Sequence, residues 1–158
     1  MAANEYQFLT EWRVAAPIEL VYEILKAGKD YERWWPDVYL ATKHEPSGHP
    51  DGIGDRVTLL TKGRLPYRLR WTATAVRAEK PGLIEISATG DFVGRGIWQL
   101  EQQGEEVYVR FDWRLRADKP LLRLLSPVFK PIFKRNHYWA MDKGQWRLKQ
   151  EVARKMAE

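Results

Sequence analysis

One histidine near the C-terminal end of the chain has the chemistry of a functional group. His137 lies in the stretch "NHYWAMDKGQW", residues 136–146, and is one of only three histidines in the protein. Imidazole changes charge near neutral pH, so it can act as a general acid or base, or bind a ligand carbonyl or hydroxyl through a hydrogen bond. A core histidine satisfied by a partner inside the protein is the third role, and the residues leave all three open.

The residues around His137 have the spacing of a long C-terminal helix, which we expect to run from about Pro131. Helical spacing places one set of residues on a single face, Phe133, His137, Ala140, Met141, Gly144, Leu148 and Val152. A glycine inside a helix costs about 1 kcal/mol relative to alanine. We therefore expect Gly144 to leave room for a cavity beside His137 and Met141.

Two tryptophans lie on nearly the opposite side of this helix. Trp139 and Trp146 share that side with the basic residues Arg135 and Lys143. Residues 114–158 contain twelve Lys and Arg against four Asp and Glu, a net charge of +8. The tryptophans either pack on the N-terminal helices or the terminal segment, or form a dimer face or a patch that touches membrane headgroups, where tryptophan beside basic residues is favoured.

Other kinds of catalytic or metal site have little support in the sequence. One loop gathers possible metal ligands, His44, Glu45, His49, Asp51 and Asp55, but their spacing matches no zinc or calcium motif, so we expect no metal site. The absence of cysteine excludes disulfides and thiol nucleophiles. No serine sits in a G-x-S-x-G elbow and "GDFVGRG" is not a phosphate-binding loop, so we expect no serine hydrolase and no cofactor.

Hydrophobic periodicity predicts the elements that position these residues. Residues 8–14, "FLTEWRV", alternate as a half-buried strand does, and an amphipathic helix follows Pro17. A second short helix, "YERWW", ends at Pro36. Residues 38–44 are expected to form a further strand, which a loop follows. Residues 56–117 repeat a strand-and-turn pattern that is typical of an antiparallel meander, and the long helix comes last. One strand, two short helices, about six further strands and a long helix indicate an α+β fold.

Four tryptophans face one side of the predicted sheet. Alternation along four separate strands places Trp12, Trp71, Trp98 and Trp113 inward. These rings either form an ordinary core or stack on a flat polycyclic or isoprenoid ligand. A strongly curved sheet wrapped on one helix rarely fills completely, so we expect a cavity between them.

Four stretches of the chain carry a resemblance to a known family. They are "AAPIELVYEIL", "YERWWPDVY", "GDFVGRGIWQLEQQGEEVYVRFDWRL" and "KPLLRLLSPVFKPIFKRNHYWAMDKG". With them the chain resembles the START-like (SRPBCC) superfamily, and within it the polyketide cyclase/dehydrase and lipid-transport type of small bacterial protein. The resemblance implies a helix-grip fold, in which a curved antiparallel sheet of about six or seven strands wraps around a long C-terminal helix over a hydrophobic pocket. It places Trp35 and Tyr39 near the pocket mouth and supplies no universal catalytic residues.

These observations lead to one favoured function and two alternatives. The favoured function is binding of a small hydrophobic or amphipathic ligand (lipid-, isoprenoid- or polyketide-like) by Trp12, Trp35, Tyr39, Trp71, Trp98, Trp113, His137, Met141 and Gly144. One alternative is a polyketide cyclase or dehydratase with His137 as general acid/base. The other is a protein- or membrane-interaction module acting through Trp139 and Trp146. The sequence favours a ligand-binding protein over an enzyme.

The bulk properties set the remaining expectations. We interpret residues 1–158 as a single domain in the cytoplasm, because the first residues are too polar for a signal peptide and no apolar run reaches the length of a membrane span. Peripheral contact with a membrane stays open. We expect no nucleic-acid partner, since the aromatic side chains of the sheet alternate away from its basic face. The protein is expected to be a monomer or a homodimer.

Overall fold

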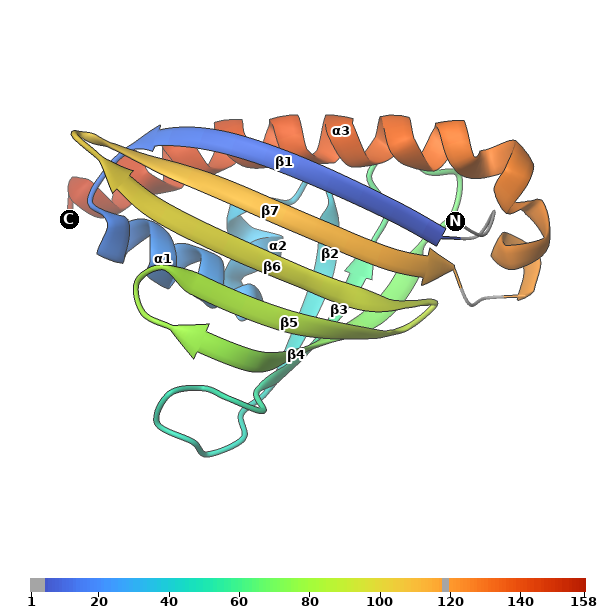
Figure 1. Cartoon of the computed structure of the whole chain (residues 1–158), viewed down its shortest axis with the longest axis horizontal. Helices are drawn as coiled ribbons and strands as arrows, with labels where there is room; N and C mark the ends of the chain where they lie inside the picture. The colour runs from blue at the N-terminus through green and yellow to red at the C-terminus, as the bar shows by residue number, and fades with distance from the viewer. Residues whose placement is uncertain (1–4, 118–119) are drawn as a thin grey trace.

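Seven antiparallel strands form one curved sheet, and a long helix lies along it (Figure 1). The computed structural model describes residues 5–117 and 120–158, the second range without the side chains of residues 121–123, 125 and 126. The elements follow in the order β1 (Glu5–Ala15), α1 (Ile18–Lys26), the 3-10 helix η1 (Gly28–Asp30), α2 (Tyr31–Trp34), β2 (Tyr39–Glu45), β3 (Arg56–Thr61), β4 (Leu69–Glu79), β5 (Leu83–Gly90), β6 (Phe92–Gln103), β7 (Glu106–Ala117) and α3 (Pro120–Met156). The strand order across the sheet is β1-β7-β6-β5-β4-β3-β2.

This architecture confirms the predicted α+β fold, including two short α-helices after the first strand. The alternation that predicted the strands also sets which side chains face inward. On β7 the inward side chains Val107, Val109, Phe111 and Trp113 are all buried. The register of β1 on β7 places Phe8 opposite Trp113 and Trp12 opposite Val109, so the apolar faces of the two strands are continuous.

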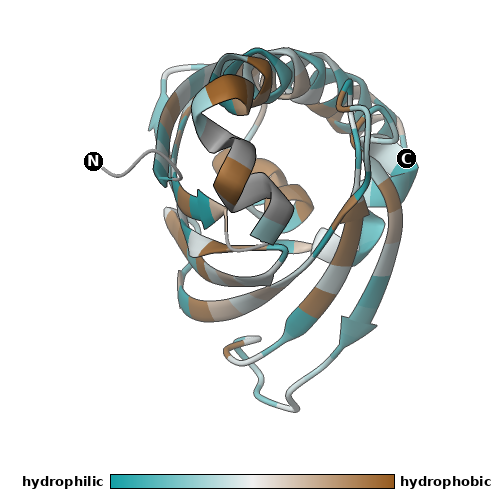
Figure 2. Cartoon of the chain, turned by 90° about the vertical axis from the view of Figure 1, so that its right-hand side faces the viewer, coloured by the Kyte–Doolittle hydropathy of each residue, from teal (hydrophilic) through white to brown (hydrophobic). Residues whose placement is uncertain are grey.

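Helix α3 begins at Pro120, well before the expected start near Pro131. Pro127 and Pro131 lie inside it and lack the N–H group of a helical hydrogen bond, which is why the sequence indicated a later start. The helix continues through both prolines and bends near its N-terminal end (Figure 1). Figure 2 shows these first turns lying across the end of the curved sheet. Among the described residues, no helix is both long and apolar enough to cross a lipid bilayer.

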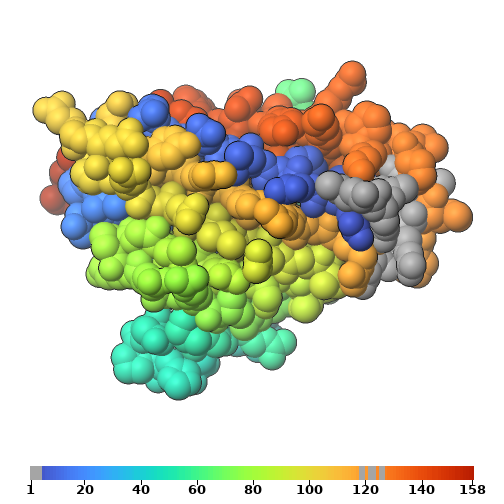
Figure 3. Space-filling model, in the orientation of Figure 1, coloured from blue at the N-terminus to red at the C-terminus, as the bar shows by residue number. Residues whose placement is uncertain are grey.

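The segment between β2 and β3 projects from the body of the molecule (Figure 3). Its two ends are held together by local hydrogen bonds rather than by core packing. The backbone N–H of Ser47 donates to Oδ1 of Asp55 at 2.7 Å, and its hydroxyl donates to the carbonyl of Ile53 at 2.6 Å. Of the candidate metal ligands in the sequence, His49, Asp51 and Asp55 lie in this projecting loop, and His44 and Glu45 lie at the end of β2. The His44 Nε2 and Asp55 Oδ2 atoms are 3.6 Å apart.

The C-terminal half of α3 is tied to the α2 region by two groups of ion pairs. Glu151, whose side chain is only 4% exposed, accepts hydrogen bonds from Arg33 at 2.6 and 3.0 Å and from Arg154 at 2.9 and 3.0 Å. Arg147 donates to Asp37 at 2.7 and 3.3 Å. A buried carboxylate with four such donors is fully satisfied, so this half of α3 has a fixed position relative to α2.

We expect Glu151→Gln to lower the free energy of unfolding at neutral pH by about 2 kcal/mol, because an amide cannot accept from both guanidinium groups. Hydrogen bonds from Arg154 and Arg33 lower the pKa of Glu151 from 4.5 to about 2. The stabilisation is therefore complete above pH 4.5 and is lost as the pH falls toward 2. Urea denaturation at neutral and acidic pH should show the difference between wild type and variant shrinking in acid.

Glu158→Gln is the matched control for this prediction. Glu158 also accepts from Arg154, at 3.1 Å, but its side chain is 60% exposed. Its loss should change the free energy of unfolding by less than about 0.5 kcal/mol. Equal effects of the two substitutions would contradict the prediction, because they would show that burial of Glu151 adds nothing to the stability that its ion pairs provide.

Candidate functional site

A cavity of about 660 Å³ lies between the sheet and α3. This volume falls within the range of roughly 300–1,000 Å³ that is typical of small-molecule sites. The cavity takes its walls from the inner faces of the strands, from the α2 region and from α3, and its aromatic lining residues are Tyr6, Phe8, Tyr22, Tyr31, Trp35, Tyr39, Trp71, Phe92, Trp98, Phe111, Trp113 and Phe133. The site is therefore a largely apolar space of ligand size inside the fold.

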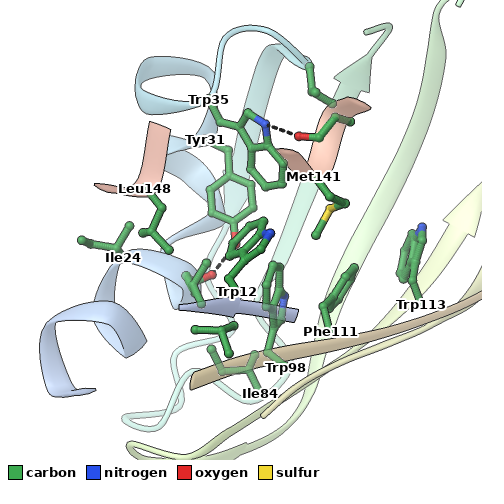
Figure 4. Packing of buried hydrophobic residues seen from close by; sticks show 14 of the residues in the cluster. Trp12, Ile24, Tyr31, Trp35, Ile84, Trp98, Phe111, Trp113, Met141 and Leu148 are labelled. Carbon is green, nitrogen blue, oxygen red and sulfur yellow. Dashed lines mark hydrogen bonds between the residues drawn. The ribbon is translucent and has the colours of Figure 1, made fainter. Parts of the chain in front are cut away.

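A continuous row of aromatic rings runs beside this cavity. We call Phe92, Trp71, Trp113, Phe111, Trp98, Trp12 and Trp35 the aromatic row. Consecutive ring centroids along it lie 4.0 to 5.9 Å apart. Its closest pair, Trp98 and Phe111, is stacked with 24° between the planes, and Figure 4 shows both rings standing side by side with Trp113. The rings come from four strands and the end of α2, so the register of the sheet builds the row.

Position 144 requires glycine for a different reason from the one expected. A Cβ atom at Gly144 would lie 2.3 Å from Cζ2 of Trp35, so the space over this glycine is filled by the indole ring. The ring is 2% exposed, and its Nε1 donates to the carbonyl of Ala140 at 3.2 Å (Figure 4). The expectation that Gly144 leaves room for the cavity is wrong. The glycine admits Trp35, and the cavity lies nearer the middle of α3, at Met141 and His137.

His137 lines the cavity and is held by two residues of β1. Its ring stacks on Phe8, with centroids 4.1 Å apart and 17° between the planes. Its Nε2 lies 3.4 Å from Oγ1 of Thr10, a long contact, and no partner for Nδ1 is found among the described residues. Burial lowers the pKa of His137 from 6.5 to about 4, so the ring is neutral at physiological pH. A neutral imidazole in this position can still donate or accept one further hydrogen bond.

Two further lining residues carry polar groups on mostly apolar side chains. The indole N–H of Trp71 is buried without a hydrogen-bond partner among the described residues. Burial also raises the pKa of the Tyr39 hydroxyl above its ordinary value, so this group stays protonated at physiological pH. Together with His137 these groups are the hydrogen-bonding positions that an otherwise apolar ligand would meet.

The cavity lining becomes charged near α1 and the projecting loop. Lys26, Lys29 and Asp51 contribute to the wall there, and the last two are exposed to solvent. Lys26 Nζ donates to the carbonyl of Asp51 at 3.3 Å, which links α1 to the loop across this region. The site therefore combines an aromatic interior with a charged rim at the surface.

The structure brings together most of the predicted ligand-binding residues. Trp35, Tyr39, Trp71, Trp98, Trp113, His137 and Met141 line the cavity. Trp12 and Gly144 are not among its lining residues, although Trp12 belongs to the aromatic row. Whether any of them contacts a ligand stays a prediction.

Seven aromatic residues of this wall were not predicted as ligand-binding residues: Tyr6, Phe8, Tyr22, Tyr31, Phe92, Phe111 and Phe133. Phe8 and Phe111 are the two with the clearest signal in the sequence. Both lie on the same alternating face as a predicted inward tryptophan of their own strand, so strand periodicity contained the signal. Phe8 was the more informative omission, because its ring is the stacking partner of His137.

The two tryptophans on the other side of α3 have different surroundings. Trp139 is half-buried under the segment that connects β3 to β4, where the guanidinium of Arg64 lies 4.8 Å from its ring centroid. The backbone N–H of Arg64 donates to Oδ1 of Asn136 at 2.7 Å, which holds this segment on α3. Trp146 is 49% exposed, with Lys143 and Arg147 over its ring at 5.3 and 4.8 Å. The connecting segment, not an N-terminal helix, covers Trp139.

Comparisons with known proteins identify relatives of this fold. A family model described as "Polyketide cyclase / dehydrase and lipid transport" matches residues 7–153. No curated protein sequence matches the chain.

Three solved structures show how widely the fold is shared. A START superfamily protein from Mycobacterium smegmatis superposes with a TM-score of 0.74 at 16% identity, covering 94% of this chain and 97% of that chain. The Zhui aromatase/cyclase from Streptomyces sp. R1128 gives 0.73 at 14% identity, covering 96% of each chain. A protein from Thermus thermophilus gives 0.71 at 17% identity, covering 90% of this chain and 97% of that chain. These similarities confirm the predicted START-like fold.

We expect Gly144→Ala to destabilise the protein by about 1–3 kcal/mol, because the new methyl group overlaps the Trp35 ring. The direction of the change in stability is informative, since alanine by itself would stabilise the helix by about 1 kcal/mol relative to glycine. Urea denaturation followed by circular dichroism measures the change. Gly82→Ala is the control, because its nearest contact would be an ordinary 3.5 Å to the carbonyl of Leu100. A Gly144→Ala protein as stable as wild type would contradict the packing described.

The neutral state of His137 predicts its titration. NMR of the imidazole protons should give a midpoint at about pH 4, with the signals assigned by their loss in His137→Gln. Because the unfolded chain takes up this proton at 6.5, His137 lowers the stability of the folded protein as the pH falls from 6.5 toward 4. A midpoint near 6.5 would show that the ring is not buried as described.

Proposed function

Since the chain belongs to the polyketide cyclase/dehydrase and lipid transport family, we propose that it binds one hydrophobic or amphipathic small molecule between the sheet and α3. The observation that carries the proposal is the 660 Å³ cavity lined by aromatic rings. Each 100 Å² of apolar ligand surface buried there contributes about 2.5 kcal/mol to affinity before the entropic cost of binding. Lipid-, isoprenoid- and polyketide-like molecules have the apolar body that this space requires.

The two ends of the lining support an amphipathic ligand over a purely apolar one. The aromatic row offers flat, wide surfaces on which a ring system or a polyene can stack. The rim at Lys26, Lys29 and Asp51 offers solvated charge. A ligand with its apolar body on the rings and a polar head at this rim would satisfy both ends.

His137 acts in this proposal as a polar anchor for the ligand. It is positioned by Phe8 and Thr10, and its remaining nitrogen can bond a ligand hydroxyl or carbonyl. A ligand oxygen on this side of the cavity would therefore be oriented by a rigid, neutral donor or acceptor.

A second candidate function is that of an aromatase or cyclase, the activity named for one structural relative. The position of His137 in the cavity wall favours it, since a general acid or base must reach the ligand. Its pKa of about 4 argues against it, because at neutral pH such a group is a weak base and is almost never in the imidazolium form that serves as a general acid. We therefore place ligand binding before catalysis.

Filling the cavity tests the proposal. Ala73, on the inner face of β4, lines the cavity, and Ala73→Leu extends a side chain into it. The fluorescent probe 1-anilinonaphthalene-8-sulfonate should bind the wild type and receive energy from the tryptophans around the cavity. We expect Ala73→Leu to weaken probe binding by about tenfold, because the added carbons occupy the volume that the probe needs.

Ala41→Leu is the matched control, since Ala41 lies exposed on β2 and is not a lining residue. It should leave probe binding unchanged. Equal binding by wild type and both variants would place the probe outside the cavity and overturn the proposed site. Thermal unfolding of each variant checks that the proteins compared are folded.

A further inference from the structure

The N-terminal part of α3 exposes large apolar side chains to solvent. Leu124 is 77% exposed, Val128 71% and Ile132 40%. They follow one another at intervals of four residues, so they form one stripe along the helix. We call residues 120–135 the capping segment, because Figure 2 shows the first turns of α3 lying across the end of the curved sheet. Exposed leucine and valine in a row are unusual on a solvated helix and indicate a contact surface.

The charge of this region has one sign only. Residues 120–141 contain Arg123, Lys130, Lys134 and Arg135 and no Asp or Glu. Lys134 and Arg135, two and three residues beyond Ile132, are exposed as well. Further along the helix, the exposed ring of Trp146 carries Lys143 and Arg147 over it. The apolar stripe and the basic residues of 120–141 match the interface of a membrane with acidic headgroups. Trp146 lies beyond the exposed Asp142 and is not part of this surface.

The other side of the same turns faces the cavity. Phe133 and His137 line it, one and five residues beyond the exposed Ile132. Figure 3 shows the described side chains of the capping segment, in orange, at one end of the molecule. Pro127 and Pro131 each remove a helical hydrogen bond from this segment.

We propose that the capping segment docks on the surface of a bilayer that contains anionic phospholipid. Leu124, Val128 and Ile132 enter the boundary between headgroups and acyl chains, and Lys134 and Arg135 bind the phosphates. The helix lies in the plane of the interface and does not cross the membrane. The proposal goes beyond ligand binding and does not depend on which molecule the cavity holds. A bilayer fits this surface better than a protein partner does. The apolar stripe needs an apolar phase, and the basic residues need a continuous negative surface.

Co-sedimentation with vesicles tests this docking surface. The full chain is mixed with vesicles of phosphatidylcholine alone, or of phosphatidylcholine with phosphatidylglycerol. We expect binding to the anionic vesicles and little to the neutral ones, with loss of binding at high salt. Val128→Glu should weaken binding at least about fivefold, and Lys134→Glu should also weaken it.

Two control variants make the same chemical changes elsewhere. Val76→Glu alters a valine that is 45% exposed on β4, and Lys43→Glu alters an exposed lysine on β2. Both should bind vesicles like the wild type. Equal losses in test and control variants would mean that net charge alone governs binding, and would overturn the proposal. So would failure of the wild type to bind either vesicle.

Light scattering after size-exclusion chromatography addresses the competing occupant, a second copy of the chain. If Val128→Glu converts a dimer into a monomer and the wild type binds no vesicle, the stripe is a subunit interface and the bilayer proposal is wrong. A monomeric wild type that binds anionic vesicles supports it. Probe binding in the cavity is measured on the same samples, so failure of docking is distinguishable from failure of the proposed ligand site.

Discussion

Helix α3 covers the concave face of the seven-stranded sheet together with the short helices α1 and α2, and its closest packing is against the α2 region. The close contact is the Trp35 ring on the backbone of Gly144, where even a methyl group would overlap the indole. This contact sets the distance between α3 and the α2 region, and the buried Glu151 cluster reinforces it. Near the middle of α3, His137 packs on Phe8 of β1, and the space between the helix and the inner faces of the other strands is the cavity.

The two halves of α3 therefore have different roles. Its C-terminal half carries the ion pairs to Arg33 and Asp37 and the fully buried Leu148. Its N-terminal half contributes Phe133 and His137 to the cavity wall and contains two prolines. The ion pairs hold the C-terminal half in place, whereas the N-terminal half forms part of the cavity wall.

The sequence predicted what depends on local pattern and failed where distant segments meet. Two-residue alternation found the inward faces of the strands, and helical spacing found the buried face of α3, because each property repeats along one element. The role expected for Gly144 was wrong because its partner, Trp35, comes from a distant segment, and no periodicity in the sequence links the two residues. The segment that covers Trp139 is likewise distant in the sequence, since it connects β3 to β4. The start of α3 was placed too late because proline signals usually end helices.

The space between the sheet and α3 is proposed to hold one hydrophobic or amphipathic small molecule. Native mass spectrometry tests this proposal most directly, on protein purified gently from its own host and on stripped protein incubated with a lipid extract. The account predicts a one-to-one adduct of a small molecule that disappears after organic extraction. The mass of the bare polypeptide alone in both samples would contradict it.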